Sequence, residues 1–585
     1  MRSFFKIFFA SLLSLVIFTV ILIFLLIAWV GALTAKDKTT VLSKSVLVLN
    51  LGQLYMEKVQ NSPLAELTGN DEGDVPGLYD VVRLIEKAKN DKKIEGIYII
   101  ANGNPNGFAT SEEIRNALID FRSSKKFIIA HGDVISQKAF HISNVADKLY
   151  ATPTGYVDWS GFSVDYVFLK GTLEKLEIQP QIFYAGKFKS ATEPFRESKM
   201  TPENKLQTTI WLSDLYDDFL IRASETRKID TATLHQLANE GKIQNAKDAL
   251  DNKLIDGLKY DDEVKDEIKT RLRKDKHDKI NFISINKYAA AGEFARTGND
   301  RIALIYAEGD IVDGKGTDNM IGSEVFRNLI RKARLDKNIK AIVFRINSGG
   351  GSALASENLW RELSLAKQDK PVVVSFGDVA ASGGYYIACA ADSIFALPTT
   401  ITGSIGVFGL IPNMEGFFKN KLGITFDGVK TATYANTGAV YRPLTENEKR
   451  MIQSEIENIY TLFKKRVAEG RKKDTAFIDS IAQGRVWTAK RALSIGLIDR
   501  FGGLDDAVEC AARMAKVTNY RLREYPQTRT LLDRILGTSS SPMEYTSEIK
   551  KQVGEENFKI YKELIRVQQM TNSMQARLPF EFIIH

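Results

Sequence analysis

The chain has 585 residues, 44% of them hydrophobic and 26% charged, so it is long enough to form several globular domains with large cores. Its 80 basic and 72 acidic residues are spread along the sequence without a basic tract or an aromatic-basic module, which argues against a nucleic-acid-binding protein. The two cysteines, Cys389 and Cys510, lie in apolar helical stretches without metal-ligand spacing. A disulfide scaffold is therefore excluded, and we expect both cysteines in the core.

An apolar run from Ile7 to Leu33 follows Arg2 and Lys6 and is long enough to cross a bilayer as a helix. A cleaved signal peptide is the alternative, but its hydrophobic region is usually shorter, and residues 32–35 offer a poor cleavage site. We therefore expect residues 1–40 to form a membrane anchor. Basic residues nearly balance on the two sides of the run, so charge alone leaves its orientation open.

After the anchor the chain repeats itself. The stretch that begins at Asp91 with the sequence DKKIEGIYI recurs from Asp336 as DKNIKAIVF, 245 positions later. The same displacement relates Gly132-Asp133-Val134 to Gly377-Asp378-Val379, Asp147 to Asp392 and Pro153 to Pro398. A period of this size indicates two copies of one domain, which we place at residues 41–290 and 291–520.

Within each copy, β-branched strand patterns alternate with helical ones, which predicts an α/β fold with a largely parallel sheet. Residues 302–306 and 341–346 are strand-like, whereas residues 352–366 are helical. Thr201-Pro202 and the capping box Thr445–Glu448 mark two further helix starts. Residues 521–585 form a tail in which 544–577 is helical in pattern, and no function is assigned to it.

The second copy contains a small-residue turn between a predicted strand, 372–374, and a predicted helix, 385–391. Ser382 lies on this turn, and Gly383 and Gly384 follow it with no side-chain cover. A hydroxyl there is open to a substrate, and the free N–H groups of the helix start point into the same space. This arrangement suits an acyl-transfer nucleophile with an oxyanion hole, although a plain tight turn is the alternative.

The first copy lacks these features, because Gln137 stands at the position of Ser382. The glycine-rich loop of residues 347–352, NSGGGS, corresponds to NGNPNG at residues 102–107. Such a loop lets a substrate backbone approach closely. A phosphate cradle is disfavoured because Gly-Lys-Ser/Thr is missing, and an ordinary turn is the remaining alternative.

A nucleophilic serine needs a proton acceptor, which is usually histidine. All five histidines lie outside the core of the second copy, so a lysine is the better candidate. Lys187 and Lys189 are two residues apart and would face the same side of a strand, and from these residues alone either could serve. Burial would have to lower the lysine pKa by about 3 units from roughly 10.4 for the amine to act at neutral pH.

Several motifs resemble the S49 family of serine proteases, in its long, duplicated, membrane-bound signal peptide peptidase A form, across nearly the whole chain. They are AASGGY at 380–385, TGSIG at 402–406, KSATEP at 189–194, QGRVWT at 483–488 and GLID at 496–499. The chain departs from the family pattern at one place, where Gly349 replaces a proline of the common sequence NSPGG.

The resemblance implies two tandem ClpP/crotonase-like domains and a Ser-Lys dyad, with Ser382 as nucleophile and Lys189 as general base. It further implies that Ser404 orients the lysine amine. The oxyanion hole would be formed by the N–H of Gly383 and by that of Gly350 or Gly351, since the changed loop leaves both as candidates. By the same resemblance, no metal or organic cofactor is involved.

The resemblance also implies an endopeptidase that cleaves membrane-derived peptides such as residual signal peptides. Such a protein would form a homotetramer resting on the outer, periplasmic face of the bacterial inner membrane and in contact with its lipid. Two other functions remain as alternatives: a crotonase-type acyl-CoA enzyme on the same fold, and an inactive membrane scaffold.

Overall fold

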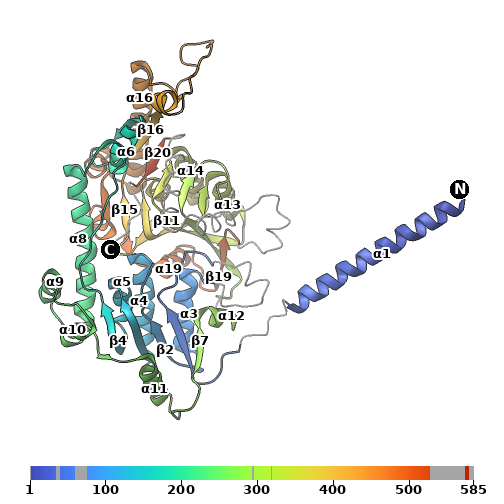
Figure 1. Cartoon of the computed structure of the whole chain (residues 1–585), viewed down its shortest axis with the longest axis vertical. Coiled ribbons are helices and arrows are strands. Elements are labelled where there is room, and N and C mark those ends of the chain that lie inside the picture. The colour runs from blue at the N-terminus through green and yellow to red at the C-terminus, as the bar shows by residue number, and fades with distance from the viewer. Residues whose placement is uncertain are drawn as a thin grey trace.

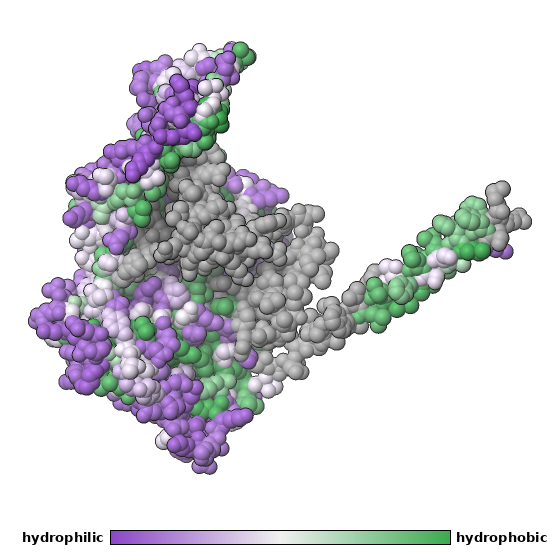
Figure 2. All heavy atoms as spheres, viewed as in Figure 1, coloured by the Kyte–Doolittle hydropathy of each residue, from purple (hydrophilic) through white to green (hydrophobic). Residues whose placement is uncertain are grey.

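A computed structural model describes residues 2–33, 40–59, 75–292, 296–317, 319–527 and 574–578. The first of these ranges is the helix α1 (Arg2–Leu33), which stands apart from the α/β body (Figure 1). Its window Phe4–Leu22 has a mean hydropathy of 2.4 and is the one described segment long and apolar enough to cross a membrane. In Figure 2 the coloured part of this helix is largely apolar, whereas the coloured surface of the body is largely hydrophilic. The helix is compatible with a membrane anchor or a signal sequence.

The first repeat is built on a six-stranded parallel sheet in the order β6-β4-β3-β2-β1-β7. The central strands β1, β2 and β3 are mostly apolar and buried, as strands covered on both faces must be. In chain order the elements are β1 (Ser45–Asn50), α3 (Leu78–Asn90), β2 (Ile94–Ile100), α4 (Phe108–Arg122), β3 (Phe127–Ile135), α5 (Gln137–Ser143), β4 (Lys148–Val157), α6 (Lys170–Lys175), β5 (Gln179–Ala185), η2 (Ser190–Thr192), α7 (Glu193–Arg196), α8 (Pro202–Arg227), α9 (Thr231–Asn239), α10 (Ala246–Asp251), β6 (Gly257–Leu258), α11 (Asp261–Arg271), β7 (Asn281–Ser284) and α12 (Ile285–Ala290).

The second repeat has a larger sheet in the order β17-β15-β13-β11-β8-β19, in which β14 also pairs with β13 and β18 pairs with β14. Its pairs are parallel except for β15 with β17. Its elements are β8 (Asp300–Glu308), β9 (Asp310–Val312), β10 (Met320–Gly322), α13 (Ser323–Leu335), β11 (Ile339–Ser348), β12 (Gly350–Ser352), α14 (Ala353–Asp369), β13 (Val372–Ala381), α15 (Gly383–Ala388), β14 (Ser393–Ala396), β15 (Ile401–Gly403), β16 (Val407–Asn413), η3 (Phe417–Lys421), α16 (Glu446–Arg471), α17 (Thr475–Ile481), β17 (Val486–Thr488), α18 (Ala489–Ser494), β18 (Arg500–Phe501), α19 (Leu504–Met514) and β19 (Tyr520–Tyr525). The predicted α/β class with parallel sheets and two repeats is confirmed.

A third, mixed sheet joins the two repeats, in the order β10-β9-β12-β20-β16-β5. It pairs β5 of the first repeat with β16 of the second in antiparallel register, from Ala185 opposite Val407 to Gln179 opposite Asn413. This sheet also contains β20 (Gln575–Arg577), a strand from the C-terminal tail. The sequence patterns within each repeat did not predict this pairing, because strand partners from different repeats carry no shared local signal.

The tail differs from its sequence-based prediction in two described places. Residues 521–525 belong to β19, which extends the second sheet beside β8, so the boundary at residue 520 cuts a strand. Residues 575–577 form β20 rather than the end of a helix, because β12 and β16 supply backbone partners that a helix could not use. The rest of the predicted helix, residues 544–573, lies outside the described residues.

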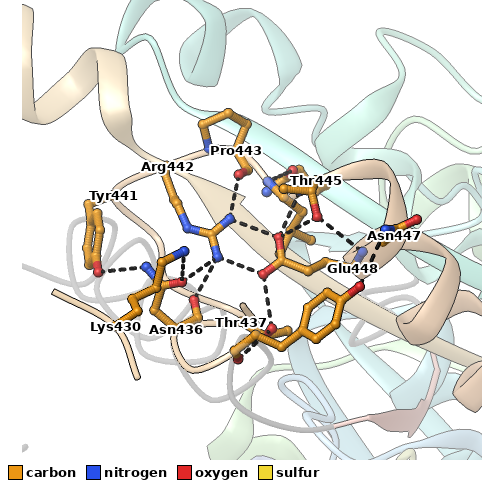
Figure 3. A network of polar contacts seen from close by, with 12 residues as sticks. Lys430, Asn436, Thr437, Tyr441, Arg442, Pro443, Thr445, Asn447 and Glu448 are labelled. Atoms are coloured by element: carbon orange, nitrogen blue, oxygen red, sulfur yellow. Dashed lines mark hydrogen bonds and ion pairs between the residues drawn. The ribbon is translucent and has the colours of Figure 1, made fainter. Parts of the chain in front are cut away.

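Both predicted helix caps are present. Thr201 accepts a hydrogen bond from the N–H of Asn204 at the start of α8, and Thr445 forms a capping box with Glu448 at the start of α16. Figure 3 shows Arg442 and Thr437 converging on the Glu448 carboxylate, which Arg442 contacts at 2.6 Å. These contacts hold the pKa of Glu448 well below its usual value. They fix the base of the segment 414–443, which projects beside α16.

Candidate active site

Ser382 lies at the junction of β13 and α15, as predicted, with backbone angles φ 53° and ψ −112°. A non-glycine residue at positive φ is strained and persists only where its surroundings fix it. Here the Ser382 N–H donates to the carbonyl of Gly403 at 2.8 Å. The next residue, Gly383, is tightly enclosed: a Cβ atom there would lie 2.6 Å from Ser356 Oγ and 2.9 Å from the Ala576 carbonyl oxygen, so a larger residue would force its neighbours to shift. The turn therefore holds the Ser382 hydroxyl in one place.

Lys189 reaches Ser382 from the other repeat. The β5–β16 pairing brings the end of β5 next to the start of β16, and a turn at Gly186, with φ 102°, directs the following residues inward. Lys189 Nζ lies 2.9 Å from Ser382 Oγ, although the two residues are 193 positions apart in the sequence. The same amine lies 3.1 Å from Ser404 Oγ and 3.3 Å from the Ser404 carbonyl.

The environment of Lys189 favours a neutral amine. The residue is 1% exposed, and burial lowers the pKa of Lys189 well below its ordinary value. Burial is the cause of this pKa shift, and no carboxylate opposes it. An uncharged amine within hydrogen-bond distance of a serine hydroxyl can accept its proton.

The structure places the two candidate lysines, Lys187 and Lys189, in different environments. Lys187 is exposed, with its amine 5.4 Å from the centre of the Phe188 ring, whereas Lys189 is buried against Ser382. The two side chains do not share a face because the segment is a turn and not a strand. The two buried histidines of the first repeat contact other groups: His141 Nε2 lies 2.9 Å from Glu112 Oε2, and His131 Nε2 lies 3.1 Å from the Lys259 carbonyl.

The glycine loop lies against the start of α15. Gly350 has φ 102°, and a Cβ atom there would lie 2.7 Å from the N atom of Gly383. The Gly350 N–H donates to Ser348 Oγ at 3.1 Å, whereas Gly351 stands opposite Ala576 of β20. The structure therefore brings Gly350, Gly351 and Gly383 together next to Ser382.

Sequence reasoning missed two residues that hold the lysine segment. Gln207 of α8 donates to Ser190 Oγ at 3.0 Å and to the Phe188 carbonyl at 3.2 Å, and its own carbonyl oxygen accepts from the Val486 N–H at 3.1 Å. It thus ties the first repeat's lysine segment to β17 of the second repeat. Gly484, part of the QGRVWT motif, contacts the Lys189 backbone. Of the two, only Gly484 lies in a motif that the sequence analysis recognised. Gln207 gave no such signal, because a single buried glutamine on a helix forms no recognisable sequence pattern.

The equivalent turn in the first repeat is structural. Gln137 exchanges hydrogen bonds with Gly161, donating at 2.8 Å and accepting at 3.0 Å. No hydroxyl occupies the position of Ser382 there, so the two described repeats contribute different parts of one site.

A serine on a strained strand-to-helix turn in an α/β fold is typical of serine hydrolases. Comparison with known proteins places the chain within this class: the profile of "Peptidase family S49" matches residues 120–275 and 364–518. The chain belongs to peptidase family S49, and it is a serine protease.

Two curated relatives illustrate the similarity. The chain is 36% identical to "Protease 4" of Salmonella typhi over 468 residues, covering 78% of this chain and 75% of the relative. It is 34% identical to "Serine protease SPPA, chloroplastic" of Arabidopsis thaliana over 441 residues, covering 74% and 64%. Among solved structures, a ClpP1 N165D mutant from Listeria monocytogenes matches 35% of this chain and 94% of its own at 16% identity, with a TM-score of 0.24.

Proposed function

We propose that the chain is a membrane-anchored endopeptidase in which Ser382 and Lys189 form a catalytic dyad. The observation that carries this proposal is the 2.9 Å contact between a hydroxyl on a strained turn and a fully buried amine. Neither feature is needed for folding, since a buried lysine without a charged partner and a serine at positive φ both destabilise the chain.

In the proposed mechanism, Ser382 Oγ attacks the peptide carbonyl while Lys189 Nζ takes its proton. The carbonyl oxygen becomes an oxyanion, which the N–H groups of Gly383 and Gly351 stabilise. We favour Gly351 over Gly350 because the Gly350 N–H already donates to Ser348 Oγ. Lys189 then gives the proton to the leaving amine, and water hydrolyses the ester.

Ser404 has a positioning role in this proposal. Its hydroxyl and its carbonyl both lie within 3.3 Å of the Lys189 amine, so they aim the nitrogen lone pair at Ser382. Ser404 itself has φ 51°, and its N–H donates to the Arg485 carbonyl at 2.7 Å, which fixes its backbone beside the lysine.

We further propose that α1 anchors the chain in the bacterial inner membrane, with both repeats on the periplasmic face. The substrates would be membrane-derived peptides such as residual signal peptides, and the assembly would be a homotetramer. An apolar helix long enough to span a bilayer and a family of proteases support this proposal.

The test uses the full chain in lipid nanodiscs with a fluorogenic signal peptide, acyl-CoA esters and a serine-directed acylating probe. We expect peptide cleavage, no acyl-CoA turnover, and labelling of Ser382. Ser382→Ala and Lys189→Ala should each lower peptide cleavage by at least about 10³-fold while the fold is kept. Full activity of either variant, or acyl-CoA turnover without peptide cleavage, would overturn the proposal.

A further inference from the structure

Glu193 is a buried carboxylate that follows Lys189 closely in the chain, at the start of α7. It is 2% exposed, and Arg196 Nη2 lies 4.0 Å from its Oε1. Its hydrogen bonds come from uncharged groups at the start of α8: the Thr201 hydroxyl at 2.5 Å, the Thr201 N–H at 3.3 Å and Asn204 Nδ2 at 2.9 Å. Burying a carboxylate without a close ion pair is unfavourable for folding, so we expect Glu193 to have a role in the site.

The charge of Glu193 fixes which way the neighbouring side-chain amides point. An ionised carboxylate only accepts hydrogen bonds, so Asn204 turns its Nδ2 toward Glu193 and its Oδ1 away. Asn204 Oδ1 lies 3.2 Å from Gln207 Nε2, which makes the nitrogen of Gln207 face Asn204. Both amides are buried, so neither can turn over without leaving polar atoms unpaired. Glu193 therefore sets the orientation of Gln207 through Asn204.

Gln207 holds the backbone on both sides of Lys189. Its Nε2 donates to the Phe188 carbonyl at 3.2 Å and to Ser190 Oγ at 3.0 Å. Its Oε1 accepts from the Val486 N–H at 3.1 Å. A reversed amide would set its nitrogen against the Val486 N–H and its oxygen against the Phe188 carbonyl, so both of these contacts would be lost.

Val486 connects these contacts to the other side chain that lies beside the lysine amine. It stands opposite Gly403 in the antiparallel pair of β15 and β17, and Ser404 follows Gly403 directly. Ser404 Oγ lies 3.1 Å from Lys189 Nζ. The Glu193–Asn204–Gln207 network therefore ties the backbone around the lysine to the strand next to Ser404.

We propose that Glu193 is a positioning residue for Lys189. It acts through Asn204 and Gln207, and the inference rests on the proposed dyad. The carboxylate keeps both amides in the orientation that fixes the lysine backbone, so the amine stays 2.9 Å from Ser382 Oγ. A displacement of about 1 Å is enough to lower the rate about 100-fold. Loss of this orientation should therefore lower kcat and leave KM nearly unchanged.

A double-mutant cycle on Glu193 and Asn204 tests the proposal, with cleavage of a fluorogenic peptide by the full chain in nanodiscs. Asn204→Asp places two buried carboxylates in contact and should lower kcat about 100-fold, with KM changed by less than about twofold. Glu193→Gln should lower kcat about 10-fold, because an amide can face Asn204 with either end. The double variant restores contact between one amide and one carboxylate, so its kcat should return to within about 10-fold of the wild type.

Asn144→Asp is the matched control. Asn144 is a buried asparagine of the first repeat whose Oδ1 contacts Arg115, outside the Glu193–Asn204–Gln207 network. Its variant should keep kcat near the wild-type value, which excludes a general effect of a buried carboxylate. Melting temperatures report whether each variant folds. If Asn204→Asp does not fold, the double variant carries the test, because it restores the contact.

Independent effects, with the double variant about 1,000-fold below the wild type in kcat, would overturn the proposal. A loss that appears in KM and not in kcat, an unchanged kcat in Asn204→Asp, an equal loss in Asn144→Asp, or a double variant that does not fold would do the same. Ser382→Ala and Lys189→Ala judge the dyad separately. If these two variants lose cleavage and the cycle shows no coupling, only the positioning role fails. If they keep full activity, both proposals fail.

Discussion

Gly484 of the second repeat packs directly on Lys189 of the first. A Cβ atom at Gly484 would lie 2.7 Å from both the Cβ and the backbone N of Lys189, and the glycine has φ 73°. The adjacent Gln483 carbonyl accepts from the Phe188 N–H at 2.8 Å, so the QGRVWT segment fixes the position of the backbone that carries the lysine. The position of the proposed base thus depends on a residue that makes no side-chain contact.

The first prediction is that Gly484→Ala lowers kcat/KM for peptide by about 100-fold, because displacing the lysine by about 1 Å misaligns it with Ser382. Cleavage of a fluorogenic peptide measures the change. Gly438→Ala is the matched control, since Gly438 has φ 83° but nothing within 4 Å of its added Cβ. Equal losses in the two variants would show that backbone strain, and not contact with Lys189, causes the effect.

The second prediction is that Lys189→Met abolishes cleavage and raises the melting temperature at pH 7 by a few °C. Burial lowers the pKa of Lys189 in the folded state, whereas the unfolded lysine titrates near 10.5. At neutral pH the unfolded wild type therefore binds a proton that the folded state does not, which favours unfolding. This cost falls as pH rises toward 10.5.

Thermal unfolding of the wild type and Lys189→Met between pH 6.5 and 10 measures this difference. We expect the stability advantage of the variant to shrink steadily as pH rises. Lys187→Met, which removes the exposed neighbouring amine, should show no such trend. A variant less stable than the wild type at pH 7 would contradict a desolvated amine at position 189.

The third prediction concerns Ser404, whose Oγ lies 3.1 Å from the Lys189 amine. Ser404→Ala should lower kcat by roughly 10–100-fold with KM nearly unchanged, because it affects the alignment of the proton acceptor and not peptide binding. Steady-state kinetics measures kcat and KM separately. Thr400→Ala removes a buried hydroxyl that donates to the Gly377 carbonyl, away from the lysine, and should leave kcat near the wild-type value.

Much of the fold was visible in the sequence because it depends on local patterns. The strand of residues 372–381, the turn at Ser382 and the caps at Thr201 and Thr445 follow from apolar periodicity, small residues and capping chemistry. The duplication was visible because the repeats retain the same residues at a fixed displacement.

The meeting of Lys189 and Ser382 could not be derived from those patterns. It depends on the antiparallel β5–β16 pairing between repeats and on a turn at Gly186 that gives Lys187 and Lys189 different environments. Family resemblance chose Lys189, whereas strand periodicity treated both lysines alike. Likewise, the sequence of residues 575–577 predicts the end of a helix. Their strand conformation depends on pairing with β12 and β16, which precede them by more than 150 residues.

A second buried cluster joins the two repeats away from the dyad. Arg345 of β11 is fully buried and contacts Glu57 Oε2 at 2.9 Å and Glu113 Oε1 at 2.6 Å. Glu308, at the end of β8, accepts from the Glu57 N–H at 3.1 Å. Burial, followed by the charge of Glu57, raises the pKa of Glu308 from 4.5 to about 8. Burial likewise raises the pKa of Glu57 to about 7.

The fourth prediction follows from the sign of these shifts. Between about pH 5 and pH 8 the folded state retains a proton on Glu308 that the unfolded state has lost, so the stability of the wild type falls as pH rises through this window. Glu308→Gln mimics the protonated carboxyl at every pH. It should match the wild type at pH 5 and melt a few °C higher at pH 8.5. Glu324→Gln, an exposed position on α13, should follow the wild type throughout. If the difference in melting temperature between the wild type and Glu308→Gln stayed constant from pH 5 to 8.5, Glu308 would be ionised in the folded protein throughout this range. The contact between the repeats would then not make stability depend on pH.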